Sequence, residues 1–293
     1  METLTFIYVH IDPTKLLFSK ELLQSNYTFS ELPSYANISL AQTKKLTKKE
    51  PIVVTNDYIN KYFQDEIREF YELCKKGMPS FYKDTFWLTT IIRLYVVYLY
   101  CSKNNINNFI HLEYDNLIYS DFKNLLNLKP NVYFTKVGEL YSSAGFVYCN
   151  NLQCYVNFID KLKQLLIKGE DTIKQFSPET FLSEMVLINL IGKHTNNIID
   201  YLPSLPFEPA NDNFNTLNTL YDGASYGQYL GGTNNGAAAG WTGNHHFIGC
   251  EIQRQKINVY FDNNDKVPYI RYLDSVIPIA NLHIHSKRLN EFI

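Results

Sequence analysis

The sequence predicts an α/β fold, with a mostly parallel central sheet flanked by helices and a loop-rich β tail. Short β-rich runs alternate with helical periodicity through the first two thirds of the chain. Beyond about residue 200, short apolar runs are separated by segments rich in Pro, Gly and Asn. The chain has 293 residues, 45% of them hydrophobic, which is enough for a large core. No repeat or linker divides it, so we expect one domain over residues 1–293.

The individual elements follow from local patterns. Runs rich in β-branched and aromatic residues predict strands at 5–10, 52–55, 109–112, 117–119, 131–137 and 145–149. Apolar residues at helical spacing predict helices at 59–76, 86–101 and 155–168. Ser177 and Pro178 suit an N-cap and a first turn, so we expect a further helix from there to Gly192. In the tail, strands are expected at 257–261 and 267–273, joined by a hairpin turn, and at 281–285.

Charge and cysteine usage exclude several classes of protein. The net charge of −2 and pI of about 6.4 argue against a nucleic-acid partner. The one basic run, Lys44 to Lys49, is interpreted as a solvated loop. The five cysteines are scattered without a C-x-x-C, which favours a reducing compartment over a zinc ribbon or disulfide framework. No signal peptide is recognisable, and the apolar stretch 86–101 is short and contains Arg93. We therefore expect a cytoplasmic protein without an integral membrane segment.

Two acidic residues follow the expected strand 109–112. Side chains alternate along extended backbone, so Glu113 and Asp115 point to the same side. Paired carboxylates offer hard oxygen ligands to Mg²⁺ or Mn²⁺ shared with substrate phosphates. In open α/β sheets, ligands bind beyond the carboxyl ends of the strands. The alternative interpretation is a surface turn that happens to carry two acids.

A second group lies in the tail. His283 and His285 share one face of the expected last strand, and Lys287 follows two residues later. Imidazole is a good metal ligand and Lys a good point charge for phosphate. By itself, H-x-H also occurs as a pair of histidines that only make structural hydrogen bonds.

Further candidates have weaker patterns. Asp222 opens a Gly-rich segment, residues 222–232, in which Tyr and Gln are interleaved with Gly; neither a Walker A nor a G-x-G-x-x-G motif is present. Glu184 lies on the expected helix before Gly192, and Gly145 follows the small residues 142–144. Trp241, beyond this segment, could stack its ring on a ligand. The alternative is a flexible loop for the Gly-rich segment, a solvated helix face for Glu184 and core packing for Trp241.

The order of these motifs resembles GT-A glycosyltransferases, whose acidic D-x-D or E-x-D motif ends a central strand. The resemblance implies a Rossmann-like fold, with Asp115 as a direct metal ligand and Glu113 contacting the metal through water or the donor ribose. Arg93, on the helix before the motif, would face the base or the diphosphate of the donor, or else be a core Arg with its head in water. Residues of about 1–150 would then bind the nucleotide sugar. Residues of about 151–293 would bind the acceptor and supply the metal- and diphosphate-binding tail.

The same resemblance assigns roles to the tail. One histidine would complete the metal shell, and we favour His285 over His283 because it lies nearer Lys287, which would reach the diphosphate. The other histidine would contact the donor. The spacing departs from the H-x-x-G-x-x-K form of the best-known retaining enzymes. Gly145 would let the donor sugar approach the backbone.

On the acceptor side, the resemblance makes Asp222 and Glu184 candidate catalytic residues. Asp222 would accept hydrogen bonds from sugar hydroxyls or stabilise an oxocarbenium-like centre, and Glu184 would be an acid beside the acceptor. The order of motifs is similar to that of glycosyltransferases from large DNA viruses and bacteria.

The implied activity is transfer of a sugar from a UDP-sugar to a hydroxyl of a glycan, glycoprotein or other acceptor, with Mn²⁺ or Mg²⁺ and with retention of configuration. Two alternatives stay open. A metal-dependent phosphohydrolase could use Glu113, Asp115 and His285. A non-catalytic carbohydrate-binding protein could keep the scaffold without needing the metal.

Overall fold

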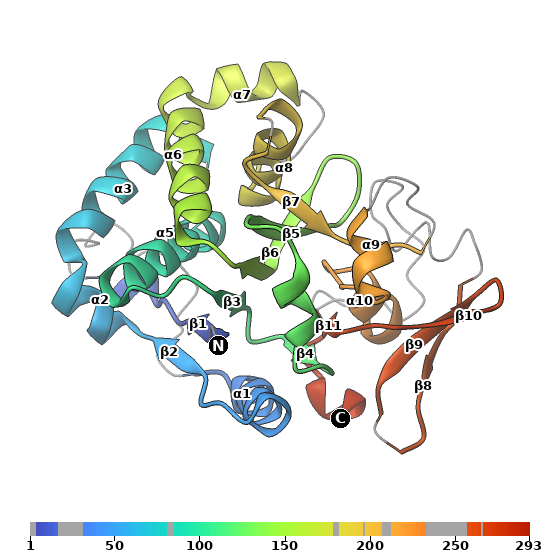
Figure 1. The fold of residues 1–293 in the computed structure, drawn as a ribbon. Coiled ribbons are helices and arrows are strands. Elements are labelled where there is room, and N and C mark those ends of the chain that lie inside the picture. Colours follow the sequence, from blue (N-terminus) through green and yellow to red (C-terminus); the bar gives the residue numbers. More distant parts are fainter. Residues whose placement is uncertain are drawn as a thin grey trace.

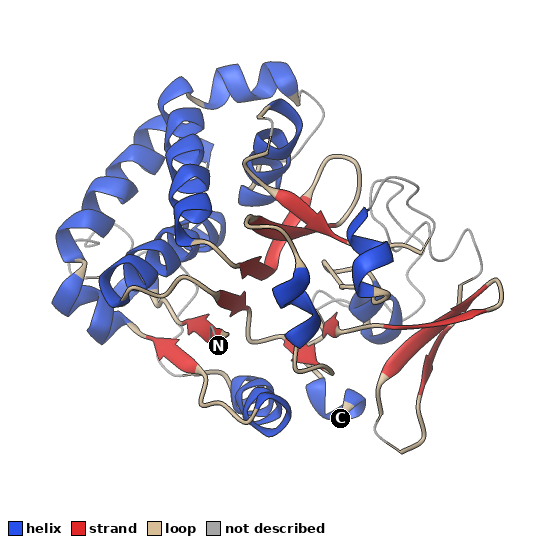
Figure 2. Cartoon of the chain, in the orientation of Figure 1, coloured by secondary structure: helices blue, strands red, loops and turns tan. Residues whose placement is uncertain are grey.

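The fold is that of a computed structural model, which describes residues 4–16, 32–80, 85–177, 182–195, 197–206, 212–232, 257–264 and 266–293. Figure 1 shows a central sheet with helices packed against it and a smaller β structure near the C-terminus. Figure 2 shows most of the long helices gathered on one side of the sheet. The predicted α/β class is therefore confirmed.

The central sheet has six strands in the order β2-β1-β3-β6-β5-β7. Their bounds are Ile52–Val54, Thr5–Val9, Phe109–Leu112, Ser142–Cys149, Val132–Lys136 and Asp200–Leu202, in that order. β1 pairs in parallel with β2 and β3, and β5 pairs in parallel with β7. β6 is antiparallel to both β3 and β5. Five of the six strands therefore run in one direction, and the sheet is mostly parallel, as predicted.

Side chains alternate between the two faces of the sheet and supply two cores. On one face, Ile7, Phe109 and Val147 pack under the long helices. On the other face, Tyr8 and Ile110 belong to a second cluster that includes Ala36 of helix α1 (Ser34–Thr47). The strands carry apolar side chains on both faces because both faces are covered.

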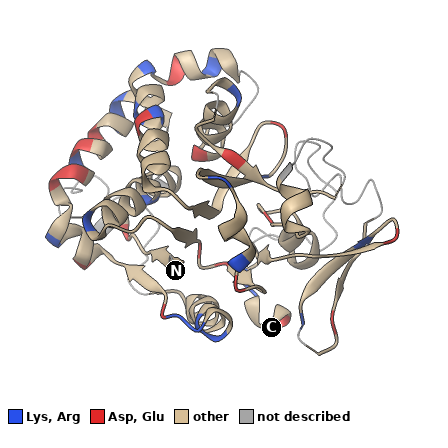
Figure 3. Cartoon of the chain, viewed as in Figure 1, with Lys and Arg blue, Asp and Glu red and all other residues tan. Residues whose placement is uncertain are grey.

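The helices surround this sheet. Those on the first face are α3 (Gln64–Gly77), α5 (Thr85–Asn104), α6 (Leu152–Lys168), α7 (Glu170–Phe176) and α8 (Glu184–His194). The shorter helices are α2 (Asn56–Tyr62), α9 (Asp212–Leu217), α10 (Tyr226–Gly231) and the 3-10 turns η1 (Pro13–Lys15), η3 (Lys123–Asn127) and η4 (Leu289–Phe292). Figure 3 shows both signs of charge along α3 and α7, as on solvated helix faces. None of the described helices combines the length and apolar character that a membrane crossing requires.

The β tail forms two small sheets. Strands β8 (Val259–Phe261), β9 (Pro268–Tyr272) and β10 (Ser275–Pro278) make an antiparallel sheet, and the hairpin between β8 and β9 is the predicted one. β11 (Asn281–His283) returns to the body and pairs antiparallel with β4 (Asn116–Ile118). This last pairing brings the C-terminal histidines to the end of β3.

Several local expectations were wrong. The helix expected at 59–76 is two helices, because the backbone leaves helical geometry at Phe63 (φ −137°). Lys44 and Lys45 lie in the last turn of α1 and not in a loop. The helix expected from Ser177 begins at Glu184, and a separate short helix, α7, ends just before Ser177. Strand β10 was not expected at all.

Candidate metal centre

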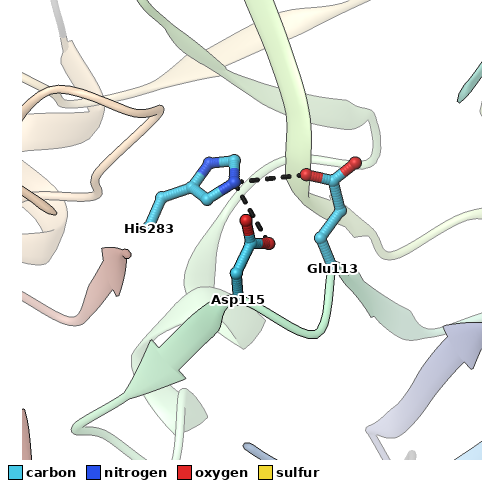
Figure 4. A group of neighbouring side chains, drawn as sticks. All are labelled: Glu113, Asp115 and His283. Atoms are coloured by element: carbon cyan, nitrogen blue, oxygen red, sulfur yellow. Dashed lines mark ion pairs between the residues drawn. The ribbon is translucent and has the colours of Figure 1, made fainter. Parts of the chain in front are cut away.

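Glu113, Asp115 and His283 meet at the carboxyl end of β3. Their potential ligand atoms all lie within 4.8 Å of one another. His283 Nε2 lies 3.2 Å from an oxygen of Glu113 and 3.2 Å from an oxygen of Asp115, and the three side chains converge in Figure 4. Two carboxylates and an imidazole are a suitable ligand set for a divalent cation.

The acidic pair is held by a tight turn between β3 and β4. The amide N–H of Glu113 donates to the carbonyl of Gly145 at 3.0 Å, and that of Asn116 donates to the carbonyl of Glu113 at 3.0 Å. The turn therefore presents Glu113 and Asp115 together at the end of the strand. His283 arrives from β11, where it pairs with Asn116. The amide of Ile284 then donates to the carbonyl of Asp115 at 2.7 Å, which fixes the histidine strand to the acidic turn.

Gly145 lies directly beside the imidazole of His283. A Cβ atom at Gly145 would lie 2.7 Å from His283 Cε1 and 2.8 Å from His283 Nδ1. Only a residue without a side chain leaves room for the ring at this point. The small residue that we expected near a donor sugar thus makes space for the histidine, and its contact with a sugar stays a prediction.

Each carboxylate also has a cationic partner. Arg93 of α5 donates to Glu113 at 2.5 Å, and Lys287 is ion-paired with Asp115. Lys287 reaches this position through a left-handed backbone (φ 62°), a conformation that is uncommon outside glycine. The two predicted phosphate-facing cations therefore lie on either side of the acidic pair.

The pKa values reflect this mutual neutralisation. Burial alone would raise the pKa of Glu113, but the charge of Arg93 and the contact with His283 lower it to about 2. For Asp115, Lys287 and His283 likewise outweigh burial and hold the pKa well below its usual range. Burial alone would lower the pKa of His283, but the two carboxylates raise it to about 10. Without a metal, a proton on His283 bridges the two acids, and a metal bound by this imidazole must displace that proton.

The geometry favours His283, and not His285, as the metal ligand. The ring of His285 lies edge-on to that of His283, with 4.5 Å between centroids, and its Nδ1 accepts from the side-chain amide of Gln228 at 2.8 Å. His285 is absent from the cluster of potential ligand atoms found among the described residues. Burial and the charge of His283 lower the pKa of His285 to about 3, so its ring is neutral. Proximity to Lys287 along the chain does not place His285 in this cluster, because β11 ends at His283 and a turn follows.

Asp222 is close to the cluster, but its carboxylate faces backbone and not open space. Its two oxygens accept from five backbone N–H groups, including that of His283 at 2.9 Å. Its exposed fraction is 1%. These contacts leave it little capacity to accept hydrogen bonds from sugar hydroxyls.

Glu184 is buried and is not on a solvated helix face. It is the first residue of α8, and its carboxyl accepts from the Thr90 hydroxyl at 2.8 Å. Burial raises its pKa to about 7, and Glu113 adds to that rise while Thr90 and Arg93 oppose it. The hydroxyl of the preceding residue, Ser183, is buried and has no hydrogen-bond partner among the described residues. A carboxyl group with a raised pKa and an unsatisfied hydroxyl therefore lie together at the start of α8.

Some residues of the site had no role in the sequence-based prediction. Asn116 and Asn281 connect β4 to β11 through a side-chain hydrogen bond of 2.6 Å. Gln228 contacts His285, and the Lys287 ammonium lies over the ring of Tyr35 at 5.7 Å from its centroid. Polar residues inside short predicted strands were the available indication for the two asparagines; nothing in the sequence indicated Tyr35. Trp241 lies outside the described residues.

Comparisons with known proteins give little beyond this geometry. No protein-family model matches the sequence, and no curated protein matches it. Among solved structures, the chain is similar to mouse xyloside xylosyltransferase 1 in its apo form, with a TM-score of 0.40 and 9% identity. That match covers 68% of this chain and 85% of the other. A likeness this distant carries no functional argument, so function has to be inferred from the site itself.

Proposed function

We propose that this protein is a metal-dependent glycosyltransferase that moves a sugar from a UDP-sugar to a hydroxyl acceptor. The observation that carries the proposal is the cluster of Glu113, Asp115 and His283 at the carboxyl end of a central strand, with Arg93 and Lys287 beside it. Carboxylates and an imidazole hold a divalent cation, while flanking cations suit an anionic diphosphate. One site would thus bind both a metal and a nucleotide diphosphate.

The residues present fit Mn²⁺ or Mg²⁺. Asp115 and His283 would be ligands, and Glu113 would bind directly or through water. The cation would act as a Lewis acid that stabilises the charge of the departing diphosphate. Lys287 and Arg93 are already held within reach of the acidic pair, and each would exchange its carboxylate partner for phosphate oxygens when the donor binds.

On the acceptor side, we propose that Glu184 donates a hydrogen bond from its protonated carboxyl to a sugar hydroxyl. Burial favours that protonated form near neutral pH, and Thr90 orients the group. The donor would bind to the first half of the chain, about residues 1–150. The acceptor would bind to the second half, which also supplies His283 and Lys287. Retention of configuration stays part of the proposal and rests on the histidine and lysine of the tail.

Calorimetric titration with UDP, with and without Mn²⁺, tests the proposal. Wild-type protein should bind UDP tightly only when Mn²⁺ is present, and Asp115→Ala should lose this metal-dependent binding. Asp121→Ala is the matched control, since Asp121 lies in a nearby turn and pairs with exposed Lys123. UDP should also bind better than ADP, because the proposal requires recognition of the base.

The other outcomes separate the alternatives. Metal-dependent binding without preference between UDP and ADP, together with release of phosphate, would favour a phosphohydrolase that uses the same cluster. Binding that is indifferent to both the metal and Asp115 would refute the metal centre and favour a non-catalytic scaffold. A screen of UDP-sugars for transfer or hydrolysis would follow the expected result and identify the donor.

A further inference from the structure

The carboxylate of Asp222 is saturated by backbone donors. Its Oδ1 accepts from the N–H groups of Ala224, Ser225 and Tyr226 at 3.0, 2.6 and 3.0 Å. Its Oδ2 accepts from Gly227 at 2.8 Å and from His283 at 2.9 Å. An ionised carboxylate offers about four lone-pair sites, so this one is filled. Asp222 therefore ties the segment 223–227 to strand β11 at the residue that enters the metal cluster.

The main chain and a side-chain amide make the same connection a second time. The N–H of Asp222 donates to Asn281 Oδ1 at 3.1 Å, and Asn281 Nδ2 donates back to the Asp222 carbonyl at 3.0 Å. Asn281 Nδ2 also donates to Asn116 Oδ1 at 2.6 Å, and Asn116 Nδ2 donates to the Gly145 carbonyl at 2.8 Å. We call Asp222, Asn281 and Asn116 the Asp222 network. This buried network runs from the Gly-rich segment through β11 and β4 to β6.

His283 is fixed on both its backbone and its ring. A Cβ atom at Gly227 would lie 2.1 Å from the His283 carbonyl oxygen, so these two backbones are in direct contact. The neighbouring carbonyl of Gly223 lies 3.3 Å from His283 Nδ1 and accepts a hydrogen bond from its N–H group. That hydrogen bond leaves Nε2 to face Glu113 and Asp115. Proteins fix the tautomer and orientation of a metal-binding imidazole through a hydrogen bond to its other ring nitrogen.

Strand β11 needs this support because it is short. It has three residues, and among the described residues it pairs with one strand, β4, which also has three residues. A two-stranded ribbon of that length is marginally stable alone. The hydrogen bonds that the Asp222 carboxylate accepts therefore add to what holds His283 in place.

We propose that Asp222 is a positioning residue for the metal centre: by fixing segment 223–227 against β11 it sets both the backbone and the ring of His283, so coordination by the imidazole depends on it. This inference rests on the proposed metal binding at Glu113, Asp115 and His283. It replaces the sugar-binding role expected for Asp222 from the sequence.

The substitution Asp222→Asn removes the charge of the carboxylate and keeps the shape of the side chain. The amide side chain would keep the volume of the carboxylate, but one of its two terminal groups would be an NH₂ facing backbone N–H donors. At least two buried N–H groups would lose their acceptor. We expect segment 223–227 to move away from β11 and the His283 ring to lose its orientation, while Glu113 and Asp115 stay where their own turn holds them.

The test is Mn²⁺ binding followed by electron paramagnetic resonance, with pulsed detection of the coupling between Mn²⁺ and a directly bound imidazole nitrogen. Wild-type protein should show that coupling, and His283→Ala should lack it. Asp222→Asn should lose the coupling and bind Mn²⁺ roughly 10- to 100-fold more weakly, the usual effect of removing a partner that orients a ligand. Asn150→Ala is the matched control: it removes three hydrogen bonds around residues 128–131 at the opposite end of β6, and it should leave the coupling intact.

A second variant guards against simple misfolding. Gly227→Ala keeps the Asp222 carboxylate but forces the segment away from the His283 carbonyl, so it should also remove the nitrogen coupling. Near-ultraviolet circular dichroism and thermal unfolding of the metal-free proteins establish that each variant is folded. If Asp222→Asn does not fold, Gly227→Ala decides the question.

The outcomes are distinct. A folded Asp222→Asn or Gly227→Ala protein with unchanged nitrogen coupling and Mn²⁺ affinity would overturn the positioning role. Wild-type protein that binds no Mn²⁺, or binds it without nitrogen coupling, would instead refute the proposed metal centre itself.

Discussion

The buried acid at the start of α8 should make stability depend on pH in a particular direction. Glu184 has its pKa raised from an ordinary 4.5 to about 7, first by burial and then by Glu113, against the opposing effects of Thr90 and Arg93. The folded state therefore binds a proton that the unfolded chain releases from about pH 4.5 upward. The contribution of Glu184 to the free energy of unfolding is therefore fully present below pH 4.5 and falls as the pH rises to 7. Above pH 7 it does not fall further.

The magnitude follows from the separation of the two pKa values. Each pH unit of separation corresponds to about 1.4 kcal/mol, so the free energy of unfolding should fall by about 3 kcal/mol across this window because of Glu184 alone. Glu184→Gln stays uncharged at every pH and can still accept from Thr90. The difference in unfolding free energy between this variant and wild type should therefore grow by about 3 kcal/mol in favour of the variant from pH 4.5 to pH 7.

Urea unfolding of both proteins in chelator, at half-unit steps from pH 4.5 to 8, measures this difference. Glu170→Gln is a control that should show no such trend in this window. Burial alone would raise the pKa of Glu170, but hydrogen bonds from Lys174 and Ser80 lower it. Glu170 thus stabilises the fold at nearly constant strength above pH 4.5 and loses that effect only on further acidification. Parallel stability curves for wild type and Glu184→Gln over the whole window would show that Glu184 is not a buried neutral acid.

Four further predictions concern the metal centre. Mn²⁺ at about 100 times its dissociation constant should stabilise the wild-type protein by about 2.7 kcal/mol in thermal unfolding, chelator should reverse this, and Asp115→Asn should not respond. Lys287→Met should bind UDP roughly tenfold more weakly in calorimetry with Mn²⁺ present, but it should not bind Mn²⁺ itself more weakly, because it removes a competing cation from Asp115. Gly145→Ala should destabilise the fold by about 1–3 kcal/mol through overpacking against His283, and unaltered stability and Mn²⁺ affinity would contradict the observed closeness of the two. His285→Ala should leave the nitrogen coupling of bound Mn²⁺ intact, and loss of that coupling would restore His285 as the ligand.

Local patterns were sufficient for most of the sheet. The strand before the acidic pair, Phe109–Leu112, was predicted with its correct bounds, because a short apolar run ending in polar residues is typical of a buried strand. The helix at 59–76 was predicted as continuous because its apolar periodicity does not reveal the break at Phe63. The start of α8 was misplaced for a related reason: Ser177 and Pro178 form a typical helix start, but the helix begins where Glu184 can be buried against Thr90.

The sequence by itself determined the α/β class, the acidic pair at the end of a strand and the two candidate histidines of the tail. These follow from periodicity and from residues adjacent in the chain. Only the tertiary structure decided that His283 joins Glu113 and Asp115, that the Asp222 carboxylate is filled by backbone donors, and that Glu184 is buried. The metal cluster and the burial of Glu184 depend on segments more than 50 residues apart in the chain coming into contact. Four of the five donors to Asp222 lie within five residues of it, and the fifth, His283, comes from the distant strand β11. The pairing of β11 with β4 and the absence of a side chain at Gly145 place His283 beside the acidic pair, and no pattern within a single segment specifies that contact.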